Sequence, residues 1–318
     1  MLHCAIDVAG AVGQAYAEEQ KSAPLSSPDP EISPMRTILA HLELSPVLDS
    51  VLASALIVAR RHDAYLEGYH MRPGQPDVIA AGADGFVAAA PDLVAGFERE
   101  AKDRAERATE RFEAFMAEHE LPRAGSRDGP GLSADWRVET ASGPSALGSR
   151  ARIFDLVVVG RPLSDEVTPS IAALEAALFD SGRLILVAPP EPPADFGKHL
   201  VIAWNGSTET ARTIGFAETY LTAAEKVTVL TVEKGTVPGP SGADLAQNLQ
   251  RRGIDAAYRE AKLGDRPIGR AILDETAALG GDLLLKGAYT QSRLRQMIFG
   301  GATSYILAEA TLPVLMAN

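Results

Sequence analysis

Asp282-Leu-Leu-Leu-Lys-Gly287 is a nearly continuous apolar run that ends on a glycine, and a loop from Ala288 to Ser304 follows it. An apolar run of this kind is typical of a strand that is buried on both faces of a parallel sheet. The loop ends in Gly300-Gly301, directly before a helical pattern. A strand, a glycine-opened loop and a helix N-terminus together present backbone N–H groups to an anion, usually a phosphate. Alternatively, the glycines only end the strand and allow a tight turn.

The same run occurs earlier in the chain as Asp155-Leu-Val-Val-Val-Gly160. Strands and helices alternate around both copies, so the chain contains two versions of one five-strand plan. We place the first domain at residues 35–190 and the second at 195–318, with the stiff linker Pro189-Pro-Glu-Pro-Pro193 at their junction. Repeated strand–helix units predict two doubly wound α/β domains in tandem, each with a Rossmann-like parallel sheet of five strands. Ligands of such sheets bind at the carboxyl ends of the strands.

Periodicity and turn residues predict the individual elements. Strands are expected at 36–41, 65–71, 135–140, 154–160, 183–187, 199–203, 227–232, 256–261, 282–286 and 312–316, and the main helices at 47–62, 92–119, 169–179, 207–221 and 243–252. Ser45-Pro46 is expected to start the first helix, Asp265 to cap the helix that opens near Pro267, and residues 74–91 to form a loop.

Composition excludes several classes of protein. The chain of 318 residues has a formal charge of −12, which disfavours binding to nucleic acid or to an anionic membrane. Cys4 is the only cysteine, so no disulfide can form within the chain. Residues 1–34 are rich in proline and serine towards their end and lack the basic region of a secretory signal. We expect a cytoplasmic protein in which these residues are a flexible extension or result from an upstream start codon, with the fold beginning at Met35.

Two stretches carry a resemblance to a known family: Ala203-Trp-Asn-Gly-Ser-Thr-Glu209 after the first strand of the second domain, and the glycine loop. They resemble the universal stress protein family, and the two-domain plan resembles its tandem members. In nucleotide-binding members the loop follows Gly-x-x-Gly, nine residues, then Gly and Ser or Thr. Gly287 and Gly300 keep this spacing, whereas Thr290 replaces the second glycine and Gly301 replaces the hydroxyl residue. Thr303 offers a hydroxyl two residues later.

The other end of the implied site also departs from the family. Asn205 stands where ATP-binding members have Asp, and Asn205-Gly206-Ser207 is equally typical of a turn followed by a helix N-cap. A β-branched residue at Thr290 resists the backbone conformation that glycine adopts freely. Arg293 and Arg295 either favour an anion or are ordinary surface arginines.

The resemblance implies an adenine nucleotide, ATP or AMP, accompanied by Mg²⁺. The implied nucleotide-binding residues are Asn205, Gly206, Ser207, Val232, Gly287, Ala288, Arg293, Gly300, Gly301 and Thr303. In the first domain the corresponding loop, 160–169, has two acids and no further glycine, so we expect a degenerate site there and a role in pairing with the second domain. A homodimer is a further possibility, and no nucleic acid or membrane partner is expected.

No motif of an established enzyme class is present. The chain lacks Gly-x-Ser-x-Gly, His-Glu-x-x-His and Walker-type sequences, so we name no catalytic residue and no metal ligand. His41 and His70 are expected near one another at adjacent strand ends, either by coincidence or as an acid–base or metal pair. The favoured hypothesis is a stress-response sensor or interaction module. The alternatives are an interaction protein that binds no nucleotide and assembles through its last strands, 184–187 and 312–316, and an ATP hydrolase.

Overall fold

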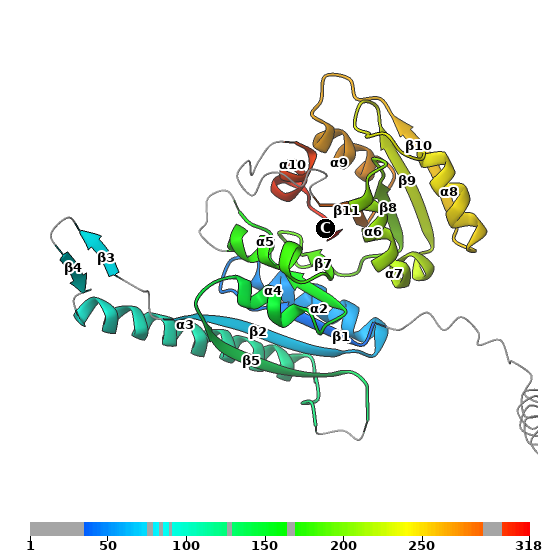
Figure 1. Ribbon diagram of the computed structural model, residues 1–318. Coiled ribbons are helices and arrows are strands. Elements are labelled where there is room, and N and C mark those ends of the chain that lie inside the picture. The colour runs from blue at the N-terminus through cyan, green and yellow to red at the C-terminus, as the bar shows by residue number, and fades with distance from the viewer. Residues whose placement is uncertain are drawn as a thin grey trace, which may run out of the picture. The chain divides into compact units, whose positions relative to one another are not determined.

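The described part of the chain contains one large sheet flanked by helices (Figure 1). The computed structural model describes residues 35–74, 79–82, 85–88, 91–125, 129–163, 169–288 and 301–318. The expected N-terminal extension, residues 1–34, lies outside these ranges. No helix in the described ranges has the length and apolar character that crossing a membrane requires.

The two halves of the chain share one alternation of strands and helices, to which the first adds a pair of short strands and the second a divided helix. The first half contains β1 (Thr37–His41), α2 (Leu48–His62), β2 (Tyr65–Pro73), β3 (Ile79–Gly82), β4 (Gly85–Ala88), α3 (Pro91–Glu118), β5 (Ser133–Ala141), α4 (Ser145–Ala151), β6 (Leu156–Val159), α5 (Ile171–Asp180) and β7 (Leu184–Val187). The second contains β8 (His199–Ala203), α6 (Thr208–Phe216), α7 (Glu218–Ala223), β9 (Lys226–Val232), α8 (Gly242–Arg251), β10 (Ala256–Ala261), α9 (Ile268–Ala278), β11 (Leu283–Gly287), α10 (Ala302–Glu309) and β12 (Val314–Ala317).

All ten strands of the large sheet are hydrogen-bonded in the order β10-β9-β8-β11-β12-β7-β6-β1-β2-β5. Neighbours within each half are parallel, so each half is a doubly wound unit of five strands, as predicted. The last strands of the halves, β7 and β12, pair antiparallel with Leu186 opposite Leu315. The edge strands of this sheet are therefore β5 and β10.

An aspartate fixes the register of the repeat in both halves. The Asp155 carboxylate accepts hydrogen bonds from the backbone N–H groups of Arg36 and Thr37, both at 2.9 Å. The Asp282 carboxylate accepts the N–H groups of residues 197, 198 and 199, all at 3.0 Å. Asp155 thus ties the start of β6 to the start of β1, and Asp282 ties the start of β11 to the start of β8. The backbone N–H groups that the aspartates bind have no hydrogen-bond partner in the sheet.

Two apolar layers form the core, one on each face of the sheet. Alternate strand residues face opposite layers, as with Leu285 in one and Leu284 in the other. The first layer takes its helical residues from α2, α3, α6, α7 and α8, and the second from α4, α5, α9 and α10. The near-continuous Leu and Val runs of the central strands are explained by this burial on both faces.

Four local expectations were wrong. Residues 207–221 form two helices, because the first ends at Phe216, directly after Gly215, a poor helix former. Residues 79–88, expected to be part of a loop, contain the antiparallel pair β3 and β4; their alanines and glycines give no strand signal. Two helices also begin later than expected, and neither has the predicted cap.

The N-cap of α2 is Val47 and that of α9 is Pro267, and neither has a side-chain cap. Ser45 instead starts a turn, in which the Ser45 carbonyl accepts a hydrogen bond from Leu48 N at 3.2 Å. Proline disfavours the helical conformation for the residue before it, so Asp265, two residues ahead of Pro267, does not become the cap.

Candidate functional site

The loops that follow β8 and β11 leave the same edge of the sheet, because these strands are parallel neighbours with Leu200 opposite Leu283. Gly287, the last residue of β11, lies against the first turn of α6. A Cβ atom at this position would be 2.3 Å from the backbone nitrogen of Thr210 and 2.7 Å from the carbonyl carbon of Glu209. Gly287 therefore has a packing role whether or not a ligand binds, because it allows the helix to approach the strand.

Asn205, Gly206 and Ser207 form a turn and the cap of α6. The Asn205 Oδ1 atom accepts from Ser207 N at 3.2 Å and from the Thr210 hydroxyl at 2.8 Å. Ser207 is the N-cap, and its hydroxyl accepts from Thr210 N at 3.3 Å. The turn and N-cap interpretation of this stretch is confirmed, and the polar atoms of Asn205 and Ser207 have partners within the loop itself.

The segment after β9 lies against this turn, which the sequence did not indicate. Val237 N donates to Asn205 O at 2.8 Å, and the Trp204 indole N–H donates to Pro240 O at 2.9 Å. Gly206 has φ +82°, and a Cβ there would be 2.9 Å from Val237 O. Val232, the predicted residue at the end of β9, is buried. The loops after β8 and β9 are therefore packed together on the side of β8 away from β11.

The remaining predicted residues lie around β11 and α10. Ala288 is buried, and its N–H extends the pairing to β12 by donating to Ala317 O at 2.9 Å. Gly301 is the N-cap of α10, with φ 110°, a conformation that favours glycine. Thr303 is buried in the first turn of α10. Arg293, Gly300 and Thr290 lie outside the described residues.

Lys286 is the unexpected member of this region. Its side chain is only 8% exposed, and Nζ donates to Gly287 O at 2.8 Å and to the Thr303 hydroxyl at 2.7 Å. Burial lowers the pKa of Lys286 to about 8. Among the described residues no carboxylate pairs with this amine. The sequence carried a signal for it, because the repeat places a lysine where the first half has Val159.

The equivalent region of the first half is filled by the chain itself. Glu43, the counterpart of Asn205, accepts a hydrogen bond at 3.0 Å from the backbone N–H of Ser170, the N-cap of α5. Burial raises the pKa of the Glu43 carboxyl. A Cβ on Gly160 would be 2.6 Å from Pro169, so this glycine too is in close contact. The first half thus supplies its own carboxylate at the N-terminus of α5.

Arg161, which follows Gly160, connects the two halves. Its side chain is fully buried, and one terminal nitrogen donates to Ile306 O at 3.1 Å and to Leu307 O at 2.9 Å. These carbonyls belong to the last turn of α10, where helix carbonyls run short of backbone partners. Ile306 O also accepts from Ala310 N at 3.0 Å. Burial lowers the pKa of Arg161 to about 10. Arg161 of the first half therefore binds the C-terminal end of α10 in the second half.

The histidines at the strand ends are neighbours, as expected. Burial and the proximity of His70 lower the pKa of His41 to about 3, and a nitrogen of His70 lies 2.6 Å from Leu42 O. Among the described residues, no group of three or more His, Cys, Asp or Glu side chains could hold a metal ion.

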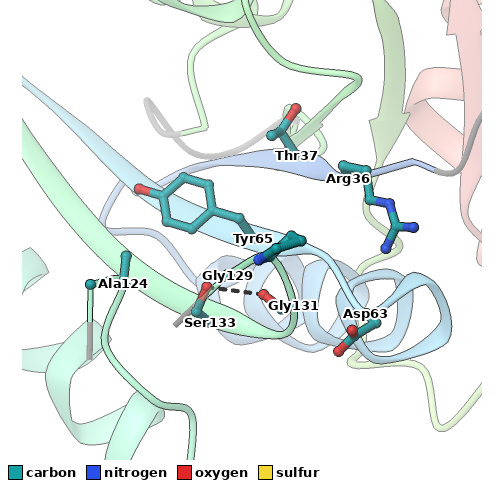
Figure 2. Close-up of a pocket in the computed structure, with 10 residues that line it drawn as sticks. Arg36, Thr37, Asp63, Tyr65, Ala124, Gly129, Gly131 and Ser133 are labelled. Atoms are coloured by element: carbon teal, nitrogen blue, oxygen red, sulfur yellow. Dashed lines mark hydrogen bonds between the residues drawn. The ribbon is translucent and has the colours of Figure 1, made fainter. Parts of the chain in front are cut away.

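The pockets of the described region include the following two. One, of about 310 Å³, lies at the amino ends of β1 and β2 and is lined by residues that include Arg36, Tyr65 and Ser133 (Figure 2). It faces away from the carboxyl ends of the strands, and its Ser133 hydroxyl donates to Gly131 O within the chain. The other, of about 490 Å³, lies between the N-termini of α9 and α10 and includes Ile268 and Gly301. The second pocket is the one that adjoins the glycine loop.

Comparisons with known proteins match the second half to a family and the chain to a solved fold. The model of the universal stress protein family matches residues 197–318. A universal stress protein from Archaeoglobus fulgidus aligns with a TM-score of 0.62 at 13% identity, over 90% of this chain and 97% of that chain. A functionally unknown protein from Pseudomonas aeruginosa has a TM-score of 0.48 at 13% identity, with 89% of this chain and 92% of that chain covered.

The cytoplasmic domain of a prokaryotic cation chloride cotransporter has a TM-score of 0.39 at 9% identity, over 88% of this chain and 94% of that chain. No curated protein matches this chain. Residues 197–318 therefore match the universal stress protein family, and the chain as a whole shares the fold of the Archaeoglobus protein.

Proposed function

We propose that the chain is a stress-response sensor or interaction module that binds one adenine nucleotide, ATP or AMP, in its second half. Mg²⁺ accompanies the nucleotide, and the phosphates lie at the N-terminus of α10. The family match over residues 197–318 supports this assignment.

One observation carries the proposal: the N-terminus of α10 has neither a side-chain cap nor an acidic residue in its first turn. The first N–H groups of a helix have no partner within it and carry partial positive charge, which suits an anion. In the first half the equivalent N-terminus, that of α5, receives the Glu43 carboxylate. The second half has Asn205 at the position of Glu43, and Asn205 bonds within its own turn. A phosphate would supply the missing negative charge.

Isothermal titration calorimetry of the full chain with ATP, AMP and cyclic AMP, each with Mg²⁺, tests the proposal. We expect binding of ATP or AMP at one site per chain, because only the second half lacks an acid at this helix N-terminus. Absence of heat with all three nucleotides would rule out nucleotide binding. Adenosine without phosphate serves as the control and is expected to bind more weakly, because it leaves the α10 N-terminus without an anion.

A second candidate function is an interaction module that binds no nucleotide. It is favoured by the hydrogen bonds of Asn205 and Ser207, which leave these side chains few free polar atoms, and by the contact of Gly287 with α6. The last strands, first considered as its assembly surface, pair with each other inside the chain, so a partner would have to use another surface.

The variant Thr290→Gly separates the two functions. It restores the second glycine of the family loop, and it is expected to create binding where the natural chain has none if the second candidate is correct. Equal nucleotide affinity of the natural chain and the variant would eliminate this candidate. The change Gly301→Ser would also restore a family residue, but the φ of 110° at Gly301 makes a side chain there strained.

A further inference from the structure

β5 is the outermost strand of the first half, and one of its sides has no neighbouring strand in the sheet (Figure 1). It runs for nine residues beside β2 without a break in register, from Ser133 opposite Tyr65 to Ala141 opposite Pro73. Long edge strands offer free backbone groups to another strand, and proteins protect them with proline, a bulge, a short length or charged side chains. β5 has only the last of these protections, and its charges are of both signs.

The backbone groups of every second residue of β5 point to the free edge. At Ala134 this edge is occupied, because the Ala134 N–H and carbonyl bond to the segment 122–124 at 2.8 and 3.1 Å. The Ala141 carbonyl faces β2 instead, where it accepts from Gly74 N at 2.9 Å. Alternate residues of a strand point their backbone groups to opposite sides, so the even-numbered residues from 136 to 140 face the free edge.

The free part of this edge is residues 135–141, between the occupied Ala134 and the end of the strand, and Val138 lies at its centre. The N–H groups of Val138 and Thr140 have no partner among the residues that the structure describes. The Val138 side chain is also 41% exposed. A second strand would therefore meet open backbone groups and an exposed apolar side chain.

The side chains on either side of Val138 make this edge complementary to itself. Arg137 and Glu139 are exposed and share the face of β5 opposite to Val138. The Tyr69 hydroxyl donates to Glu139 Oε2 at 3.2 Å, which holds this carboxylate over the sheet. In an antiparallel pair with Val138 opposite Val138, Arg137 of each copy lies opposite Glu139 of the other. Opposite charges that face each other across strands stabilise the pair.

We propose that two copies of this chain associate through β5, in an antiparallel arrangement centred on Val138. The Val138 N–H and carbonyl of each copy bond to those of the other, and Thr140 N–H donates to the Trp136 carbonyl of the other copy. Trp136 N–H keeps its bond to the Asp135 carboxylate, at 2.9 Å. The centre of the free edge and the centre of the charge pattern coincide, which favours a second copy over a strand of unrelated sequence. The inference goes beyond the proposed nucleotide function and does not depend on it.

The other edge strand of the sheet, β10, lacks this complementarity. It has six residues, and Gln250 Nε2 donates at 2.7 Å to Ala256 O, which faces away from β9. Its neighbouring charges, Arg259 and Glu260, are adjacent in sequence and so lie on opposite faces. Self-pairing of β10 therefore cannot bring them opposite each other, whereas the two charges of β5 share a face.

Sedimentation velocity of the full chain over a wide range of concentrations tests the inference. We expect a reversible dimer with twice the chain mass of 33.6 kDa, because the contact is shorter than that of a permanent dimer. Val138→Lys places like charges opposite each other at the centre and should weaken self-association at least about tenfold. Tyr258→Lys is the matched control, since Tyr258 is an exposed large residue of β10, and it should associate like the natural chain.

Charge reversals test the register. Arg137→Glu places acids opposite acids, and Glu139→Arg places bases opposite bases, so each variant alone should self-associate more weakly than the natural chain. A mixture of the two variants places acids opposite bases and should form a dimer with one copy of each. Circular dichroism checks that every variant is folded.

A disulfide crosslink reports on Val138 alone. Cys4→Ser removes the only cysteine of the chain, and Val138→Cys in this background places two thiols in a pair whose Cα atoms are about 5.5 Å apart, within reach of a disulfide. Mild oxidation should join two copies, whereas Tyr258→Cys in the same background should give no crosslinked dimer.

Three results would overturn the inference. The first is a natural chain that stays monomeric at every concentration. The second is a dimer that Val138→Lys leaves unchanged, and its loss on removal of residues 1–34 would assign the contact to that segment. The third is a mixture of Arg137→Glu and Glu139→Arg that does not associate.

Discussion

Replacing Gly287 with alanine should destabilise the protein far more than a single methyl group suggests. The new Cβ would lie 2.3 Å from the Thr210 nitrogen and 2.7 Å from the Glu209 carbonyl carbon, both of them backbone atoms. Ordinary contacts between such atoms are about 3.5 Å, so α6 must move by about 1 Å or the strand must bend. Overpacking of this kind typically costs about 1–3 kcal/mol, and we expect about 3 kcal/mol because no flexible side chain can relieve it.

Gly215→Ala is the matched control, because Gly215 is an exposed residue of the same helix and a Cβ there would meet nothing within 4 Å. Alanine in a helix is more favourable than glycine by about 0.5–1 kcal/mol, so this variant should be more stable than the natural chain. Urea denaturation followed by circular dichroism gives both free energies of unfolding. A loss below 1 kcal/mol for Gly287→Ala would refute the packing role of Gly287.

Three further predictions concern buried and paired charges. Asp282→Asn should lower the free energy of unfolding by about 2 kcal/mol, because it loses charge-assisted hydrogen bonds to three backbone N–H groups. Urea denaturation measures this loss. The control is Asp274→Asn, which removes one partner of an exposed ion pair, and an equal loss in the two variants would contradict the prediction. The pKa of Lys286 is about 8 in the folded chain, against an ordinary value of 10.5. Between these pH values the unfolded chain binds a proton that the folded chain does not, so the free energy of unfolding rises with pH by up to about 3 kcal/mol. Lys286→Met should lack this rise, and parallel pH-dependent denaturation curves for the two proteins would exclude it. Arg161→Ala should cost about 3 kcal/mol and accelerate hydrogen exchange in the last turn of α10, because the Leu307 carbonyl loses its side-chain donor and Ile306 O keeps only Ala310 N. Unchanged exchange there would contradict this prediction.

The strand order could be predicted from the sequence because its signals are local and repeated. The Leu and Val runs after Asp155 and Asp282 mark the fourth strand of each half, and alternation of strands with helices restricts the topology to parallel crossovers. The break at Ala217 and the missing side-chain caps of α2 and α9 depend on fine backbone conformation, which periodicity does not report.

The candidate site was less predictable, because its contacts join residues far apart in the chain. The sequence indicated Gly287 and Thr303 through spacing, and Asn205 through its place after a strand. It did not show that Val237 and Pro240 pack over the Asn205 turn, or that Arg161 reaches α10. Lys286 was visible as a charge at the end of an apolar run, but its importance depends on burial and on the absence of a described carboxylate partner.

The central claim is that the second half binds one anionic nucleotide and that the first half, with Glu43 at the equivalent helix N-terminus, binds none. Native mass spectrometry of the gently purified full chain, before and after addition of ATP and Mg²⁺, tests it most directly. We predict a single added nucleotide per chain. Two nucleotides per chain, or none at saturating ATP, would contradict the claim.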